Sequence, residues 1–169
     1  MRSQKLRKRT YSSAFRPRRR AFEPLESRQM LATFTVTSLL DNTTPDDGFT
    51  TLREAVLAAN LNGDADTIQF ASNLTGDLNL LSISDVGVGA SALAVTSPIT
   101  IQGNTNGITI RRDAAASEMR LFRITATGSL TLEMLTLANG VGRGTSGTAG
   151  TPNGGDGRGG AIFNQGSLL

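Results

Sequence analysis

Four arginines that lie close together in the chain are the first candidates for chemistry: Arg111, Arg112, Arg120 and Arg123. Two acidic residues, Asp113 and Glu118, lie among them. If this stretch forms neighbouring strands of a coil, the guanidinium groups could share one face and contact an acidic glycan, or one of them could act in catalysis. A solvated basic face without a ligand is the simpler interpretation, and both interpretations stay open here.

The residue types that are absent exclude several other chemistries. The chain of 169 residues has no His and no Cys, which excludes disulfides, a thiol nucleophile, a His general base and a zinc site of the usual Cys/His kind. Its only lysines, Lys5 and Lys8, lie near the N-terminus. A binding surface therefore fits this inventory better than an active site does.

Five aspartates flank a predicted helix and carry oxygen ligands of the kind that Ca²⁺ prefers: Asp41, Asp46, Asp47, Asp64 and Asp66. They lack EF-hand spacing, and aspartates that form turns are the commoner explanation. The Gly-rich run 154–160 has neither the Walker order of glycines and lysine nor the glycine order of Ca²⁺-binding repeats, so it is interpreted as a loop. We expect no cofactor, with Ca²⁺ left open.

One amphipathic helix is predicted over residues 51–60. Thr51 and Glu54 have the spacing of a capping box, in which a hydroxyl and a carboxylate bond the free N–H groups at a helix start, and this explains both residues without a catalytic role. Gly63 provides a stop. Arg53 is expected to pair with a neighbouring acid. The apolar face of the helix must pack on another part of the protein and consists of Leu52, Ala55, Val56 and Ala59.

Short stretches of alternating apolar residues predict β-strands through the rest of the chain. Gly, Asn or Ser commonly separates them, and they lie at 33–38, 67–70, 99–101, 108–110, 122–124, 130–132, 135–137 and 161–163. Such strands are too short for a free-standing sheet. They suit a coil in which each strand stacks on the next and Ile, Leu and Val fill the interior. The expected fold is an all-β parallel solenoid.

An internal repeat supports the coil. Residues 124–130 and 162–168 share the pattern Ile-x-x-x-Gly-Ser-Leu at an offset of 38 residues. Two turns of a coil, or one turn that carries an insertion, would explain this spacing. The insertion would be the Gly-rich tract 140–160, which is expected to loop out on one side.

Charge divides the chain near Arg28. Residues 1–28 hold ten basic and two acidic residues, for a net charge of +8, whereas the remainder carries −5. The first 21 residues contain no acid and little apolar surface to offset the entropy of ordering, so this arm is expected to be disordered. No apolar stretch there has the length of a secretory signal core or a membrane span. The arm has three alternative interpretations: export or envelope sorting, nonspecific polyanion binding, or a transit peptide. Sequence-specific binding of nucleic acid is not expected.

Three stretches resemble known families. Residues 34–70, with their Thr-Thr-Leu-Arg-Glu-Ala core, resemble the CSLREA domain that opens many bacterial right-handed parallel β-helix proteins, although Thr50 and Thr51 stand where that name has Cys and Ser. Residues 159–162, Gly-Gly-Ala-Ile, are similar to a repeat of chlamydial polymorphic outer-membrane proteins, without its companion Phe-x-x-Asn element. Residues 22–32 resemble the LEPR-x-LL segment of large surface proteins of planctomycete bacteria, and the candidate sorting residues are Glu23, Pro24, Leu25, Glu26, Arg28 and Leu31.

These resemblances imply a right-handed parallel β-helix with one N-terminal capping α-helix. They divide the chain into a basic arm with a sorting motif (1–32), a CSLREA-like cap (33–70) and incomplete coils (71–169). Because the sequence ends inside an expected strand, we expect an N-terminal fragment or a truncated product.

The function that these resemblances imply is that of a secreted or cell-surface protein of adhesin or structural type, which is non-enzymatic and binds glycans or surface proteins along its side face. The alternative is a carbohydrate-active β-helix enzyme that resembles polysaccharide lyases. By resemblance, such an enzyme needs carboxylates that gather Ca²⁺ and a Lys or Arg base. Its site would lie on the 111–123 face or mostly outside this fragment.

Overall fold

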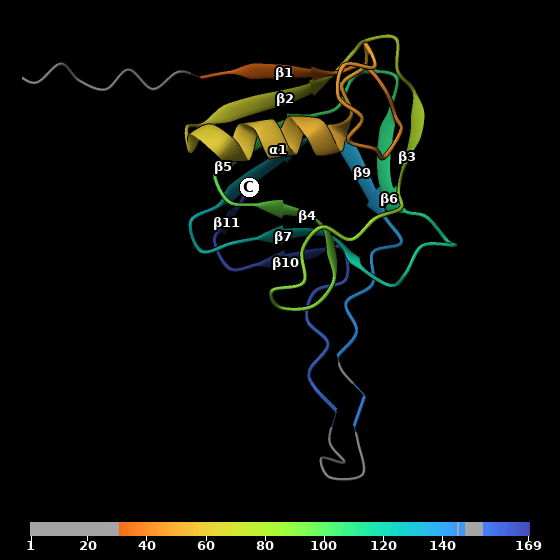
Figure 1. Ribbon diagram of the computed structural model, residues 1–169, viewed down its shortest axis with the longest axis vertical. Coiled ribbons are helices and arrows are strands. Elements are labelled where there is room, and N and C mark those ends of the chain that lie inside the picture. The colour runs from red at the N-terminus through yellow and green to blue at the C-terminus, as the bar shows by residue number, and fades with distance from the viewer. Residues whose placement is uncertain (1–30, 145, 148–153) are drawn as a thin grey trace, which may run out of the picture.

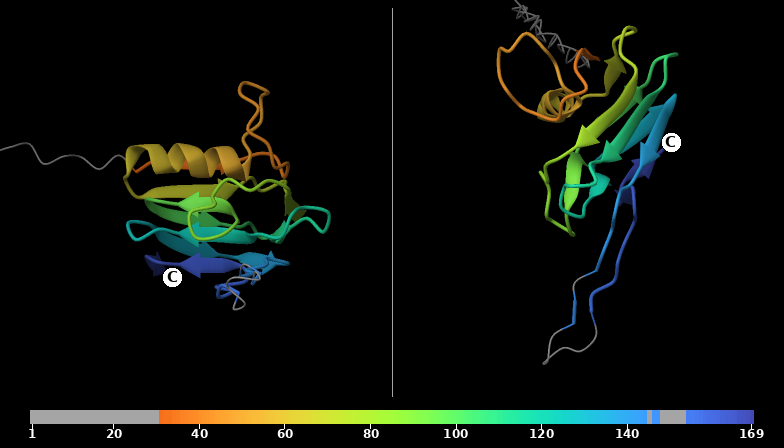
Figure 2. Two further views of the ribbon diagram at one scale, coloured as in Figure 1. Left: turned by 60° about the horizontal axis from the view of Figure 1, so that its bottom comes forward. Right: turned by 90° about the vertical axis from the view of Figure 1, so that its right-hand side faces the viewer.

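The protein folds as a parallel β-solenoid of three coils with one helix (Figure 1). The structure is a computed structural model and describes residues 31–144, 146–147 and 154–169. In each coil the chain passes through the same three sheets, and Figure 2 shows the coils stacked on one another. The expectation of an all-β solenoid is therefore confirmed.

Three parallel sheets form the walls of the solenoid. Sheet A contains, in spatial order, β1 (Thr33–Val36), β2 (Asp66–Phe70), β5 (Pro98–Gln102), β8 (Ser129–Glu133) and β11 (Ser167–Leu168). Sheet B contains β3 (Gly76–Leu80), β6 (Ile108–Arg112) and β9 (Leu135–Ala138). Sheet C contains β4 (Ser91–Val95), β7 (Arg120–Ile124) and β10 (Ile162–Asn164). Each complete coil contributes one strand to each sheet.

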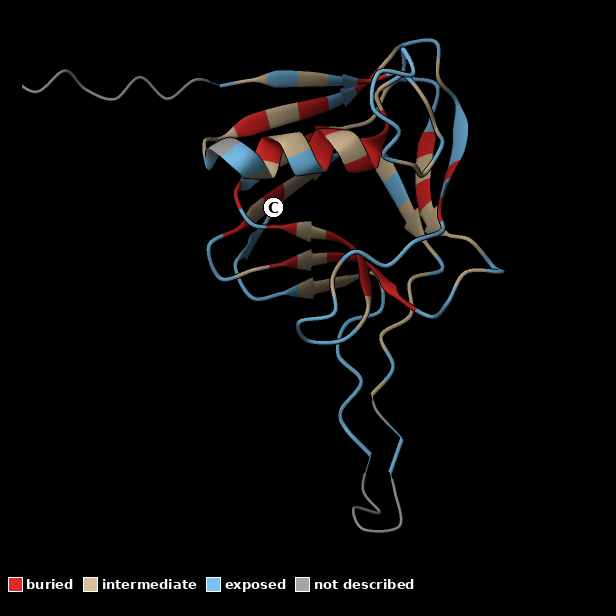
Figure 3. Ribbon diagram, in the orientation of Figure 1, coloured by how far each residue is buried: buried red, intermediate tan, exposed pale blue. Residues whose placement is uncertain are grey.

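Rows of buried and mostly aliphatic residues, with one residue from each coil, lie in register along the sheets and form the core. Figure 3 colours the buried residues red. Ile68 pairs with Ile101 on sheet A, and Leu93 pairs with Phe122 on sheet C. Side chains alternate between the two faces of a strand, so the apolar side chains of each coil stack on those of the next coil in the interior. All four of these side chains are buried. These stacked rows of side chains form one continuous core and set the register between coils.

The helix α1 (Leu52–Asn62) lies at one end of the stack, against β1, β2 and β4 (Figure 2, left). The predicted capping box is present: the Thr51 hydroxyl accepts from the Glu54 amide, and the Glu54 carboxylate accepts from the Thr51 amide at 2.9 Å. The helix ends at Gly63, which has a left-handed backbone conformation. The predicted apolar face is buried, which confirms the prediction that this face packs on the protein, and it comprises Leu52, Ala55, Val56 and Ala59.

The helix also satisfies backbone groups on the edge of β4, which has no strand on that side. Arg53 Nη1 donates to the Ala92 carbonyl at 2.7 Å, and Asn60 Nδ2 donates to the Ala94 carbonyl at 2.8 Å. These carbonyls are two residues apart on one strand, so they point to the same side. Side chains of α1 thus take the hydrogen bonds that a further strand would make, and leave less of this edge open to pairing.

Two strands and one register differ from expectation. The strands β3 and β4 were not predicted, because Gly-Asp-Leu-Asn-Leu and Ser-Ala-Leu-Ala-Val contain few of the β-branched residues that mark a strand. The offset of 38 residues holds between β8 and β11, where Ser129 pairs with Ser167, but β7 and β10 pair at an offset of 40. The repeat is therefore one coil with an insertion. The two offsets differ because the turn between β10 and β11 is two residues shorter than the turn between β7 and β8.

The insertion leaves the body of the solenoid between β9 and β10 as two arms that run side by side (Figures 1 and 2). A Cβ atom on Gly142 in the first arm would collide with the carbonyl oxygen of Gly159 in the second. The arms therefore approach one another more closely than a residue with a side chain permits. The tract does loop out as predicted, with close contact between its arms near the solenoid.

Candidate binding site

A pocket of about 90 Å³ lies where the insertion meets sheet C. Three segments that are distant in sequence form its wall: the loop before β4, the start of β7 with the residue two positions before it, and the first arm of the insertion. We call it the Arg120 pocket, and its lining residues are Ala90, Glu118, Arg120, Val141, Gly142 and Arg143.

Arg120 is the central side chain of this pocket. It opens β7, and only 3% of its surface is exposed. Its Nε donates to the Arg158 carbonyl at 2.5 Å, and its Nη1 donates to the Val88 carbonyl at 3.1 Å. Arg120 therefore ties the second arm of the insertion to the loop before β4.

The charge of Arg120 has no carboxylate partner within the described part of the chain. Its stabilising contacts are carbonyl oxygens and the ring of Phe163. The centre of this ring lies 5.1 Å from the guanidinium carbon. Burial of a charge is costly unless it is paired or hydrogen-bonded. Arg120 is hydrogen-bonded but not neutralised, and this leaves a positive potential at the pocket.

The loop before β4 is shaped to reach Arg120. Gly89 has a backbone φ of +102°, and a Cβ atom there would lie 2.9 Å from Nη1 of Arg120. Glycine fits both the positive φ and the short distance. The loop is held in place by a pair of backbone hydrogen bonds between Asp85 and Ser91.

Two charged residues of opposite sign complete the pocket wall. Arg143 Nη2 and Glu118 Oε1 form an ion pair of 2.7 Å, with side chains 71% and 46% exposed. The first arm is attached to the body nearby, where the Val141 amide donates to the Met119 carbonyl at 2.9 Å. Arg120, Arg143 and Glu118 together give the wall a net charge of +1. The arrangement can hold one small anion, because two guanidinium groups line one pocket that is open to solvent on one side.

The four arginines predicted from the sequence do not gather on one face. Arg111 and Arg112 lie on β6 of sheet B, whereas Arg120 and Arg123 lie on β7 of sheet C. Arg111 pairs with Asp77 at 2.6 Å on the outside of sheet B. On β6, strand alternation gives Arg112 the parity of the buried Ile108 and Ile110 and gives Arg111 the opposite parity.

The remaining two arginines bond within the protein. Arg112 donates to the carbonyls of Asn139, Asp113 and Ala116. Arg123 pairs with Asp85 at 2.8 Å and also donates to Gln165. Of the four predicted residues, Arg120 is the one that lines the pocket.

The sequence did not single out Arg143 or the role of Glu118. Arg143 lies in the Gly-rich tract that was interpreted as a loop, and nothing in the sequence indicates that the first arm folds back against β7. The one available signal is a charged residue among glycines.

Of the candidate sorting residues, Leu31 is described and is 74% exposed. The others lie outside the described residues, as does the basic arm, and are Glu23, Pro24, Leu25, Glu26 and Arg28.

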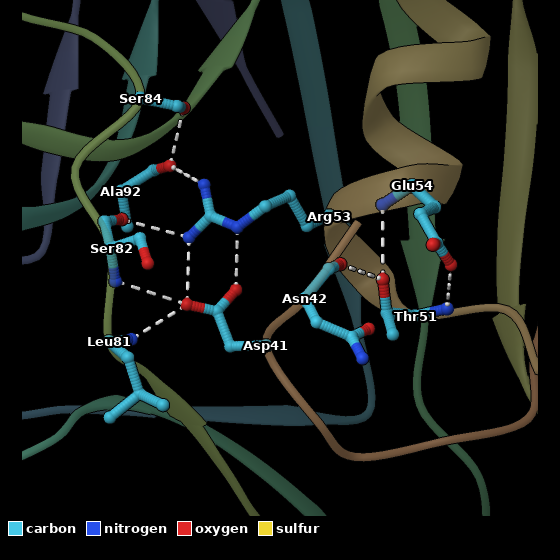
Figure 4. A network of polar contacts seen from close by, with 9 residues as sticks. All are labelled: Asp41, Asn42, Thr51, Arg53, Glu54, Leu81, Ser82, Ser84 and Ala92. Carbon is cyan, nitrogen blue, oxygen red and sulfur yellow. Dashed lines mark hydrogen bonds and ion pairs between the residues drawn. The ribbon is translucent and has the colours of Figure 1, made fainter. Parts of the chain in front are cut away.

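A second polar centre lies beside the helix, around the ion pair of Arg53 and Asp41 (Figure 4). The prediction that Arg53 pairs with a neighbouring acid is confirmed, because Asp41 accepts from its Nε at 2.7 Å and from its Nη2 at 2.9 Å. Asp41 also accepts from the amides of Leu81 and Ser82. The Arg53 and Asp41 side chains are 6% and 1% exposed, and the pair joins the loop before α1, the helix and the segment after β3.

The aspartates considered as Ca²⁺ ligands have separate places in the structure. Asp41 pairs with Arg53, and one carboxylate oxygen of the buried Asp66 accepts from the Ala32 amide. Asp47 accepts from the amide of Phe49 two residues on, which is the behaviour of a turn aspartate. No group of three or more acidic residues that could hold a metal ion occurs among residues 31–144, 146–147 and 154–169.

Comparison with models of protein families, with curated proteins and with solved structures finds no match for this chain. Within the part of the chain that the structure describes, no helix is long and apolar enough to cross a membrane.

Proposed function

We propose that this protein is a secreted or cell-surface β-solenoid of adhesin or structural type, which binds glycans or proteins at its side and does not act as an enzyme. The observation that carries this proposal is the Arg120 pocket. A buried arginine of the predicted contact set lines a pocket on the side of the solenoid, next to a projecting insertion. Pockets with a few convergent polar groups are the usual place for ligand binding.

The proposed location outside the cell rests on sequence resemblance. The segment 22–32 is similar to a sorting motif of planctomycete surface proteins, and residues 34–70 and 159–162 resemble parts of bacterial surface β-helix proteins. The test is a fusion of residues 1–32 to a reporter in a planctomycete host. Recovery of the reporter outside the cytoplasm supports export, and retention in the cytoplasm contradicts it.

Binding is tested on a glycan array that carries neutral, uronate-containing and sulfated glycans, with the full chain as the probe. We expect the protein to bind one class of glycan. The Arg120→Met variant should bind the same class much more weakly. Arg111→Gln serves as the control, since it removes a partly exposed arginine on sheet B. The absence of binding to every class, or equal loss in both variants, would count against a glycan-binding role for the pocket.

The lyase-like alternative is favoured by one observation, the presence of a carboxylate and two guanidinium groups in the wall of a single pocket. Incubation of the full chain with uronate polymers and Ca²⁺ distinguishes the two roles. We expect binding without the appearance of unsaturated products. Unsaturated ends that form with the protein and disappear in Arg120→Met would assign catalysis to the pocket instead.

A further inference from the structure

We infer that the Arg120 pocket binds a single oxyanion group of an acidic sugar, either the carboxylate of a uronate or a sulfate ester, with Arg120 and Arg143 as its cations. This inference rests on the proposed glycan-binding function and names the class of glycan. It also assigns Glu118 a role as a competitor for Arg143, which weakens binding of the anion.

The first argument is charge. Arg120 is 97% buried and is held by carbonyl oxygens and a ring, with no carboxylate partner in the described part of the chain. Arg53 is buried to nearly the same degree and has a carboxylate that accepts two of its hydrogen bonds. A guanidinium with a free side toward a pocket is a site for a planar or tetrahedral oxyanion, because such groups accept charge-assisted hydrogen bonds from it.

The second argument is size. The pocket measures about 90 Å³. An engineered cavity of about 150 Å³ is known to hold a benzene molecule. The Arg120 pocket is smaller than that cavity and opens to solvent, so it has room for a carboxylate or a sulfate, while the sugar ring to which it is attached lies at the surface.

The third argument is that Arg143 is available. Its ion pair with Glu118 is exposed, and exposed ion pairs contribute little, about 0–1 kcal/mol. The guanidinium can therefore turn from Glu118 to a bound anion at small cost. Gly142 next to it packs closely on the backbone of Gly159, where a Cβ atom would collide with the carbonyl oxygen. The site thus combines one fixed cation with one adjustable cation.

The experiment measures the dissociation constant of the full chain for three oligosaccharides by calorimetry at physiological ionic strength. The ligands are oligogalacturonate, its methyl ester and a sulfated oligosaccharide. We expect one or both anionic ligands to bind and the methyl ester to bind at least about tenfold more weakly, since a charge-assisted hydrogen bond is lost. The anionic ligand that binds identifies the source of the oxyanion.

Two matched pairs of variants locate the effect. The Arg111–Asp77 ion pair on sheet B resembles Arg143–Glu118 in length, although the Arg111 side chain is less exposed, at 35%. We expect Arg143→Gln to weaken binding about tenfold, and Arg111→Gln to leave it unchanged. We expect Glu118→Gln to tighten binding about two- to fivefold, and Asp77→Asn to leave it unchanged. A merely structural role for Glu118 would not produce tighter binding.

The outcomes separate this inference from the function on which it rests. If the acid and its methyl ester bind equally well, glycan binding stands and the oxyanion inference is overturned. Asp77→Asn and Glu118→Gln change the net charge equally, and the basic arm is the same in all variants. If both substitutions tighten binding to the same degree, the attraction is a general effect of net charge, and the pocket is rejected as the binding site. If no glycan binds on the array, the proposed function itself fails.

Discussion

Two buried arginines on opposite sides of β4 have different environments. Arg53 lies between α1 and β4, and its charge is neutralised by a buried aspartate that accepts two of its hydrogen bonds. Arg120 lies between β4 and the Gly-rich insertion, and its stabilising contacts are two carbonyls and a ring. The comparison teaches that burial alone does not distinguish a structural arginine from a binding one. Arg112 likewise donates to carbonyls and has no carboxylate partner among the described residues, but it does not line the pocket. The binding role that we propose for Arg120 therefore depends on its missing partner charge together with its place in the pocket wall.

Buried polar atoms without a partner occur near both arginines. Around Arg53, the helix provides further bonds, such as the Ser97 hydroxyl that donates to the Ala59 carbonyl at 3.1 Å. Around Arg120, the buried Ser91 hydroxyl and one oxygen of Asp85 make no hydrogen bond within the protein. Buried polar groups in proteins are usually satisfied, and exceptions concentrate at functional sites and at sites of ordered water. Asn42 Oδ1, next to the Thr51 cap, and one oxygen of Asp66 on β2 also lack a partner among the described residues. The two arginines therefore differ in their own partners and not in how well their surroundings are satisfied.

The largest expected effect comes from removing the partner charge of Arg53. Asp41→Asn leaves a buried guanidinium without a carboxylate, and we expect it to lower the free energy of unfolding by about 3–5 kcal/mol. Urea denaturation followed by circular dichroism measures this change. Asp77→Asn removes the exposed partner of Arg111 and serves as the control, with an expected loss below about 1 kcal/mol. Equal losses in the two variants would show that burial of the Arg53–Asp41 pair has no special weight.

A smaller loss of stability is expected at the other arginine. Arg120→Met keeps an apolar side chain near Phe163 but leaves the carbonyls of Val88 and Arg158 without this donor. We expect a cost of about 1–3 kcal/mol, which is the usual penalty for buried acceptors that lose their partner. The same denaturation experiment measures it. A loss as large as that of Asp41→Asn would indicate that Arg120 is chiefly a structural residue, which contradicts the comparison.

The smallest expected effect compares two buried serines. Ser97→Ala removes a hydroxyl that bonds the helix and should cost about 1 kcal/mol. Ser91→Ala removes a hydroxyl without a partner in the protein and should leave the free energy of unfolding unchanged or slightly raise it. The two variants have the same chemical change, so a difference in their midpoints of denaturation isolates the contribution of the hydrogen bond. Equal costs would mean that the Ser91 hydroxyl is satisfied in solution.

The elements that could be predicted from sequence are those that local rules determine. The capping box of Thr51 and Glu54, the stop at Gly63 and the alternating strands all depend on residues close in sequence, and the structure confirms them. The strand β4 could not be predicted in this way, since its Ala and Ser residues are stabilised by neighbours in other coils and by Arg53. Its existence depends on contacts across long sequence separations.

The candidate site was predictable only in part, for the same reason. The sequence identified Arg120 as a charged candidate, but placed it with three other arginines on one face. Strand parity and the division between sheets B and C separate them. The contribution of Arg143 depends on the insertion returning to β7, and that return depends on the close contact of glycine backbones in its two arms. No local pattern encodes such a contact.

The most direct test of the different roles of the two arginines is nuclear magnetic resonance of their Nε–H groups in the full chain during titration with the anionic oligosaccharide that binds most tightly. Substitution of each arginine by lysine assigns the signals. We predict that the Arg120 and Arg143 signals shift with a common dissociation constant, whereas the Arg53 signal stays unchanged. Saturating shifts of Arg53 together with an unchanged Arg120 signal would contradict the account.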